Sequence, residues 1–454
     1  MTPDELVHVR QRLEAFAAEV FVPLARSDQR AKGETYLRGL LLDGQRKSMQ
    51  PMADRLGVDH QGLQQFVTTS TWDTDAVRAR LARKAVETIG PVAWAVDDSG
   101  FPKDGASSPG VARQYSGTLG KVANCQIGVS VHAVTDTASC PLGWKLFLPE
   151  SWDTAKAGPA AVKAAKAKRR KTLKNAPRAA APGDDQARPG AEVDVEAVTE
   201  AARARRNRCG IPEKEGHRPK WTLAVEMLDE FAEHGLRPPV LVADAGYGDN
   251  AQFRAALDKR DIAYSVQLKG DALAHNREAV PVAREWSGTG RCGRPPAGTT
   301  PVYTGEPVSL ARHVAAAGRE SVRTISWREG SKGTLSSQFV FLQVRPAGHR
   351  VPRDGDDGVL PQRWLIAEWP DDEPEPVTYW LSSLPTTTRH ADLIRYAKIR
   401  WRIEHDYREL KTGLGLDHFE GRSWQGWHRH VTLVTAAHLF LTLLRGDPKA
   451  AAPA

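Results

Sequence analysis

The sequence predicts an α/β protein with an all-α N-terminal region. Residues 1–90 place apolar side chains at helical spacing and show no strand pattern. Residues 91–150 contain three short apolar runs, VAWAVDDS, CQIGVSVHAV and WKLFLP, which predict an antiparallel meander of strands. From Trp221 onward a helix, the strand PVLVADAG, a second helix and the strand AYSVQL follow one another, an order typical of a parallel sheet. A mixed sheet is therefore expected.

The chain has 454 residues, a length that suggests two or three domains. In the first of them, Gly57 and Asp59 separate two short predicted helices within SMQPMADRLGVDHQGLQQFV. This spacing fits a helix-turn-helix, and it fits an ordinary helical hairpin equally well. We expect a helical DNA-binding domain at 1–90 and a core built on the mixed sheet. The first part of this core spans 91–274 and contains a low-complexity basic insertion at 154–207, and its C-terminal helices span 386–445. A β-rich insertion is expected at 275–385 and a disordered tail at 446–454.

Charge and cysteine content narrow the classes of function. The formal net charge is +8, which favours a polyanionic partner, nucleic acid first, although many basic proteins bind none. The insertion is basic from Lys163 to Arg178 without an acid, so it either contacts DNA phosphates or forms a solvated linker. The four cysteines form no C-x-x-C pair, and neither structural zinc nor disulfides are expected.

No membrane association is expected either. The longest apolar run, Val431 to Leu444, is too short to span a bilayer and predicts a buried helix. The charged N-terminus does not have the pattern of a signal peptide, so we expect a cytoplasmic protein that associates with the nucleoid when it acts.

Three acidic residues occupy positions that are suited to a catalytic site. Asp97 and Asp244 each end an apolar strand, and Glu404 lies within a long helix predicted from about Ala391 to Thr412. One such strand-ending acid usually has no special role, but two of them with a helical acid predict a site, because the ends of strands meet where α/β proteins bind ligands. Two-metal phosphodiester cleavage requires oxygen ligands, so this set predicts two Mg²⁺ ions, with Mn²⁺ as a substitute.

Cations follow the helical acid on one face. Arg400, Arg408 and Lys411 stand four residues before, four after and seven after Glu404, close to the same side of the helix. Such cations hold the phosphates beside a metal site, although a salt-bridged surface helix produces the same spacing.

These residues resemble a known family. The run RWRIE at 400–404, with Lys411 seven residues after the glutamate, resembles the Y-R-E-K signature of bacterial DDE insertion-sequence transposases. The runs DDSGFPKDG, GVARQYSGTLGKVANCQIGVS, LPESW, ADAGYGD and GLGLDHFEGRSWQGWHRH are similar to the DDE superfamily endonucleases. The resemblance covers about Phe16 to Leu444 without the basic insertion. It implies an RNase H-like catalytic core with a β-rich insertion between the second Asp and the Glu.

The resemblance assigns the acids residue by residue. Asp97 corresponds to the first acid of a D-x-[ST] motif, and its neighbour Asp98 is the reserve candidate. Asp244 and Glu404 correspond to the second and third acids. Glu409 breaks the spacing from the signature arginine and is the reserve for the third.

The resemblance also assigns cations and a tyrosine. Arg400 and Lys411 correspond to the phosphate-contacting cations of the signature, and Arg408 is a further candidate for DNA phosphate. Tyr396 is the candidate for the signature tyrosine, but it precedes Arg400 by one residue more than the family pattern.

Together these observations predict a DNA transposase that cleaves insertion-sequence ends and transfers strands. Its partner is double-stranded DNA, both terminal inverted repeats and target, and bringing two ends together favours a dimer on DNA. One alternative is a catalytically inactive, transposase-derived DNA-binding protein. Another is a general RNase H-like nuclease, which has no need of an N-terminal DNA-binding domain.

Overall fold

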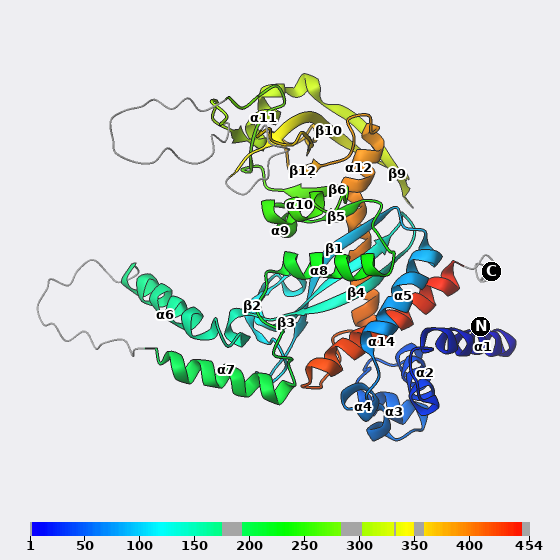
Figure 1. The fold of residues 1–454 in the computed structure, drawn as a ribbon. Helices are drawn as coiled ribbons and strands as arrows, with labels where there is room; N and C mark the ends of the chain where they lie inside the picture. The colour runs from blue at the N-terminus through cyan, green and yellow to red at the C-terminus, as the bar shows by residue number, and fades with distance from the viewer. Residues whose placement is uncertain (1, 175–192, 283–301, 331–332, 349–357, 447–454) are drawn as a thin grey trace, which may run out of the picture.

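The computed structural model describes residues 2–174, 193–282, 302–330, 333–348 and 358–446 (Figure 1). The middle of the basic insertion and most of the expected C-terminal tail lie outside the described residues. The domain limits expected from the sequence stay predictions.

The elements follow the expected order. The helices are α1 (Pro3–Val20), α2 (Ser27–Leu41), α3 (Met49–Leu56), α4 (His60–Thr68), α5 (Thr74–Ile89), α6 (Ala157–Lys174), α7 (Val195–Cys209), α8 (Lys220–Glu233), α9 (Ala245–Gly248), α10 (Ala251–Asp258), α11 (Leu310–Ala317), α12 (His390–Lys398), α13 (Arg402–Arg408) and α14 (Trp424–Arg445). The strands are β1 (Ala93–Pro102), β2 (Ala112–Ser116), β3 (Lys121–Val134), β4 (Ser139–Phe147), β5 (Leu241–Ala243), β6 (Tyr264–Leu268), β7 (Leu273–Asn276), β8 (Val308–Ser309), β9 (Arg323–Gly330), β10 (Gly333–Pro346), β11 (Arg363–Glu368) and β12 (Thr378–Ser382). Short helical turns are η1 (Gly117–Leu119), η2 (Glu150–Trp152), η3 (Arg319–Ser321), η4 (Ile399–Trp401) and the π-helical η5 (Glu409–Gly413).

Within the described residues the strands form one mixed sheet, as the sequence predicts. Its order is β2-β3-β1-β5-β6-β12-β11-β10-β7-β8, with β4 beside β3 and β9 beside β10. β1, β5 and β6 are parallel, and β3 and β4 complete the antiparallel meander beside β1. The strands of the expected β-rich insertion continue the same sheet, because β12 pairs with β6. The mixed α/β fold agrees with an RNase H-like core.

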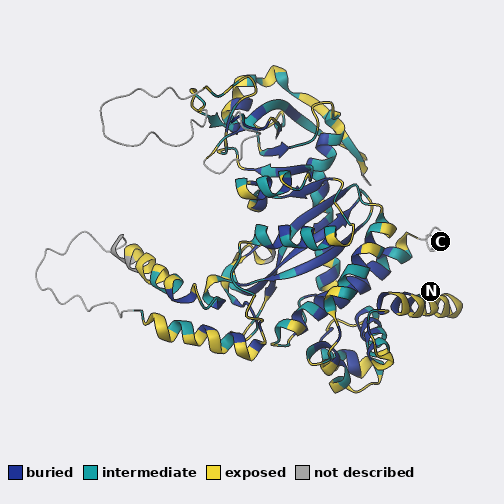
Figure 2. Ribbon diagram, viewed as in Figure 1, coloured by how far each residue is buried: buried dark blue, intermediate teal, exposed yellow. Residues whose placement is uncertain are grey.

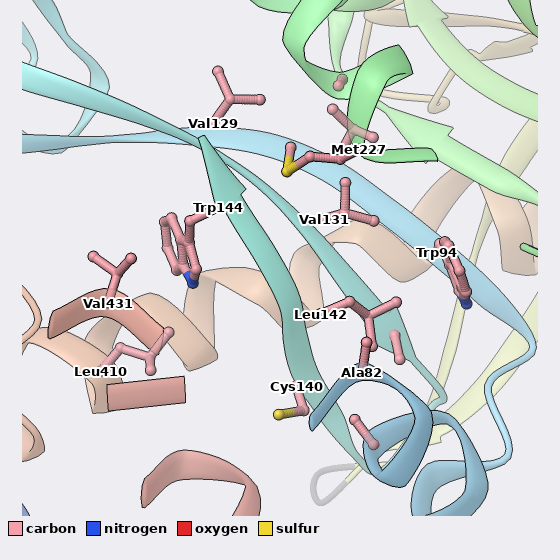
Figure 3. Packing of buried hydrophobic residues seen from close by; sticks show 14 of the residues in the cluster. Ala82, Trp94, Val129, Val131, Cys140, Leu142, Trp144, Met227, Leu410 and Val431 are labelled. Atoms are coloured by element: carbon pink, nitrogen blue, oxygen red, sulfur yellow. The ribbon is translucent and has the colours of Figure 1, made fainter. Parts of the chain in front are cut away.

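The two faces of β1 and β5 pack against different helices. Alternate residues of a strand point to opposite faces. Trp94 and Val96 belong to the large core that α5, α8 and α14 cover, part of which is shown in Figure 3. Their neighbours Ala93 and Ala95 instead pack with Val242 of β5 and with residues of η4 and α13. The second face is therefore the one that the helix of Glu404 covers.

The N-terminal helices share this large core. It runs from α1 to α14 without interruption, and α14 lies against α2, α4 and α5. Arg429 of α14 is fully buried and donates hydrogen bonds to the carbonyls of Val67, Ser70 and Trp72. The helices α3 and α4 are separated as predicted, because Gly57 is left-handed (φ 67°) and the Asp59 carboxylate caps α4.

The segment that carries Glu404 is helical, as predicted, but it is not one regular helix. α12 ends at Lys398, the 3₁₀ turn η4 follows, then α13, and η5 ends the run as a π-helix. Lys398 binds Glu368 on β11 and Asp406 binds His132 on β3, so the two ends of the segment are attached to distant strands. Tightened and widened turns adjust the register between such fixed points and are common at functional sites.

One hairpin of helices lies outside this core. α6 and α7 form a hairpin that projects from the β2 end of the sheet and is largely exposed (Figures 1 and 2). In the described part of the chain, no helix is both long and apolar enough to cross a membrane.

Candidate active site

Asp97 and Asp244 lie side by side on the face of the sheet that η4 and α13 cover. Val96 and Ala243 are register partners on the parallel strands β1 and β5, so the two acids follow at adjacent positions. By alternation Asp97 shares the face of Ala95, and Asp244 shares that of Val242. The Asp244 carboxylate also caps α9 by accepting the backbone N–H of Tyr247 at 3.4 Å.

The environment of Asp97 favours a positive charge nearby. Burial raises the pKa of Asp97 to about 7, the Arg400 guanidinium acts in the opposite direction, and the carboxylates of Asp244 and Asp98 add to the rise. Arg400 donates to Asp97 through Nη1 at 2.8 Å. A buried carboxylate with two acids beside it is a place where a cation is stabilised.

Glu404 is linked to this pair of acids by the side chain of Arg400. Its Oε1 lies 3.8 Å from Arg400 Nη2, and its side chain is 68% exposed. A cavity of about 220 Å³ lies beside it on the same face of the sheet, lined among others by Val242, Gln267 and Trp401. Among the described residues, no three His, Cys, Asp or Glu side chains lie close enough to hold a metal ion in this arrangement. The guanidinium thus lies between the first and third predicted acids.

The donor set nevertheless fits hard divalent cations. Asp97, Asp244 and Glu404 offer carboxylate oxygens only, which Mg²⁺ and Mn²⁺ prefer. The excess negative charge around Asp97 is compensated by Arg400 alone among the contacts described for that carboxylate. A divalent ion would supply the same compensation with more charge.

The reserve acids have other partners. Asp98 points to the opposite face of β1, where Lys220 Nζ lies 3.0 Å from both of its carboxylate oxygens. Glu409 binds Arg445 at 2.7 Å and His438 at 3.3 Å on α14, and these contacts hold its pKa at about 2. Asp98 thus faces away from Asp244, and Glu409 is tied to α14, which supports Asp97 and Glu404 as the better candidates.

The remaining predicted residues are placed as follows. Arg408 is exposed at the end of α13. Lys411 donates to the carbonyl of Gly100 on β1 at 2.8 Å, and burial lowers its pKa. Tyr396 is half-buried and packs against the small buried cluster to which η4 contributes. Val92 and Leu384 pack against the same cluster. Their contacts with DNA phosphate stay predictions.

Sequence reasoning missed a buried polar network behind the site. The Tyr407 hydroxyl lies 2.7 Å from Ser130 Oγ, and Ser130 lies 3.0 Å from His132 Nε2. His132 Nδ1 donates to Asp406 at 3.0 Å, and Ser139 donates to the same carboxylate. The network ties α13 to β3 and β4, and thereby fixes the helix of Glu404. Its one sequence signal is the polar alternation SVH within an apolar strand.

Gly248 allows the close approach that positions Asp244. A Cβ at this residue would lie 2.0 Å from the Gln267 carbonyl oxygen on β6. We expect Gly248→Ala to push α9 away from the sheet and to lower the free energy of unfolding by about 1–3 kcal/mol, as overpacking does. Urea denaturation measures the change. Gly62→Ala, where the added methyl meets nothing within 4 Å, is the matched control; an equal loss in both variants would contradict the account.

The mixed sheet, with two neighbouring acids on parallel strands and a helix over them that carries a third acid, is the fold of an RNase H-like core. The family model described as DDE superfamily endonuclease matches residues 19–334, and the chain belongs to this family. The match ends before Glu404. The chain is also 32% identical over 114 residues to a protein from Microchaete diplosiphon named "Probable transposase for insertion sequence element IS701", an alignment that covers 24% of this chain and 30% of that protein.

Proposed function

We propose that the protein is a DNA transposase that cuts the ends of an insertion sequence and joins them to target DNA. The observation that carries the proposal is the pair Asp97 and Asp244, adjacent on parallel strands under the helix of Glu404, in a chain of the DDE endonuclease family. The similarity to a probable transposase supports the element end as substrate.

In this proposal Asp97, Asp244 and Glu404 hold two Mg²⁺ ions, with Mn²⁺ as a substitute. Bound divalent ions supply charge stabilisation to the attacking and leaving oxygens of phosphodiester chemistry and activate water at neutral pH. Arg400 leaves Asp97 when the ions bind and contacts a DNA phosphate, since a guanidinium pairs well with either anion. The buried network of Asp406 and His132 keeps α13, and with it Glu404, at a fixed distance from β1.

The substrate is double-stranded DNA, and two copies of the chain would synapse two ends. The helices α2, α3 and α4 pack together as three helices with a capped turn between the last two, which supports a helix-turn-helix role in binding the ends.

The test is cleavage of duplexes that carry the inverted repeats flanking the gene. We expect cleavage with Mg²⁺ or Mn²⁺, none with EDTA, and none by Asp244→Ala. Cleavage that persists in EDTA contradicts the proposal. Binding of the ends that survives chelation, without cleavage at any metal concentration, identifies the inactive DNA-binding alternative. Equal digestion of unrelated DNA or RNA hybrids identifies a general nuclease.

A further inference from the structure

The hairpin of α6 and α7 has a fixed base. Arg206 of α7 is buried and donates to the carbonyls of Trp152, Pro212 and Glu215, while Arg205 lies over the Trp152 ring at 4.9 Å. The two helices approach closely at Gly158, where a Cβ would lie 2.4 Å from Val195 Cγ1. The base is therefore built to hold the hairpin in a defined direction.

The base also joins the hairpin to the loop that follows β1. The Trp152 indole donates to the carbonyl of Val111, and Cys209 Sγ contacts the carbonyl of Ser107. β1 extends five residues beyond Asp97, about 17 Å at 3.3 Å per residue. The hairpin begins beyond that end of the strand, so a duplex that runs along β1 from a phosphate at Asp97 reaches the hairpin after about five base pairs or more, given 3.4 Å per base pair.

The two helices differ in charge compensation. The outer part of α7 carries the acids Glu196 and Glu200, and Arg203 pairs with Glu200. On α6 no acid occurs at all, and the chain places seven Lys and Arg residues between 163 and 174. Like charges three and four residues apart destabilise an isolated helix by about 0.2–0.5 kcal/mol per pair. An anionic partner removes this repulsion.

Four of the exposed cations of α6 fall on one side of the helix, and the exposed Lys168 faces another direction. Lys163, Lys166, Arg170 and Lys171 are exposed and stand at i, i+3, i+7 and i+8. An 18-residue helix is about 27 Å long at 1.5 Å per residue, enough to follow a DNA backbone across several phosphates. Between Lys163 and Lys171 the apolar side chains are three alanines, so this part of the helix offers no large apolar surface to a partner.

We propose that α6 is a phosphate-binding arm that holds duplex DNA flanking the cut site, about five base pairs or more from the scissile phosphate. The inference rests on the proposed function, because it assigns the duplex to the DNA substrate of that reaction. The arm supplies charge and reads no bases, since its long basic side chains contact the sugar-phosphate backbone.

The experiment measures the salt dependence of DNA binding in EDTA, where no cleavage occurs. The probe is a 40-base-pair duplex of arbitrary sequence, and the variant replaces Lys163, Lys166, Arg170 and Lys171 by glutamine, which keeps helix propensity. Four lost phosphate contacts should make the negative slope of log K against log salt shallower by about three to four units. The matched control replaces four exposed cations elsewhere, Arg83, Arg237, Lys259 and Arg312, by glutamine and should keep the wild-type slope.

The cleavage step separates an arm from a catalytic role. The α6 variant should raise the DNA concentration at which cleavage is half-maximal, and the matched control should not. An unchanged salt slope overturns the proposal. A changed oligomeric state in sedimentation without a changed slope also overturns it, and would place α6 in the acidic cavity lined by Asp75, Glu226 and Glu230 of a second copy. If the wild-type chain binds duplex DNA through α6 but never cleaves it, the proposed function is contradicted, while the DNA-binding role of α6 is still supported.

Discussion

Replacing Asp97 by asparagine is expected to slow cleavage of element ends by about 10³-fold or more, because losing a metal-binding carboxylate removes several kcal/mol of transition-state stabilisation. Asparagine keeps the shape of the side chain and removes its charge. Binding of the same DNA in EDTA should be unchanged or slightly tighter, since one negative charge is lost near the phosphates. Single-turnover cleavage with Mg²⁺ and a gel-shift titration measure the two quantities.

Asp98→Asn is the matched control for this prediction. Asp98 is the next residue of β1, but it faces Lys220 on the other side of the sheet. We expect its loss to change the cleavage rate far less than the loss of Asp97. The opposite order, with Asp98→Asn inactive and Asp97→Asn active, would transfer the metal-binding role to the reserve residue.

The second large effect is on stability. Asp406→Asn is expected to lower the free energy of unfolding by about 1–3 kcal/mol, because the buried donors of His132 and Ser139 lose their carboxylate acceptor. Asp406 is 1% exposed, and its carboxylate accepts from His132 and Ser139. Urea denaturation at pH 7 checks the value. Asp392→Asn, which removes an exposed pair with Arg389, is the control and should change stability little.

The same network determines how the free energy of unfolding changes with pH. Burial lowers the pKa of His132 below its ordinary value of 6.5, so the unfolded chain binds a proton that the folded chain rejects. Stability is therefore complete above pH 6.5 and falls as the pH drops below it. The pKa of Asp406 is also lowered, although burial opposes the bonds from His132, and its contribution is lost only below about pH 4.

His132→Gln separates this contribution from other buried histidines. The variant should be less stable at pH 7.5, but between pH 6.5 and 5 its stability should fall less steeply than that of the wild type. The difference in slope is at most one proton, about 1.4 kcal/mol per pH unit. An unchanged slope would show that His132 is not held neutral by the fold.

The first two candidate acids were predictable because strand geometry is local. Asp97 and Asp244 each end an apolar run, and parallel strands bring such ends to one edge of a sheet. The order of helices and strands around β5 and β6 was predictable for the same reason. The caps at Gly57 and Asp59 also depend on nearest neighbours only, and the structure shows both.

Contacts between distant segments were not predictable. The bond between His132 and Asp406 joins residues 274 positions apart, and no local pattern in either segment indicates it. The π-helical turn after α13 follows from such anchoring rather than from propensity. The same holds for the contact between Arg400 and Asp97, which joins residues 303 positions apart. Docking of the N-terminal helices on α14 depends likewise on tertiary packing.

The most direct measurement is an electron paramagnetic resonance titration of Mn²⁺ against the protein bound to an element end. Our account predicts binding of two ions by the wild-type complex, marked loss of bound Mn²⁺ in Asp97→Asn and Asp244→Asn, and retention in Asp98→Asn. Wild-type Mn²⁺ binding that persists unchanged in both Asp97→Asn and Asp244→Asn would contradict it.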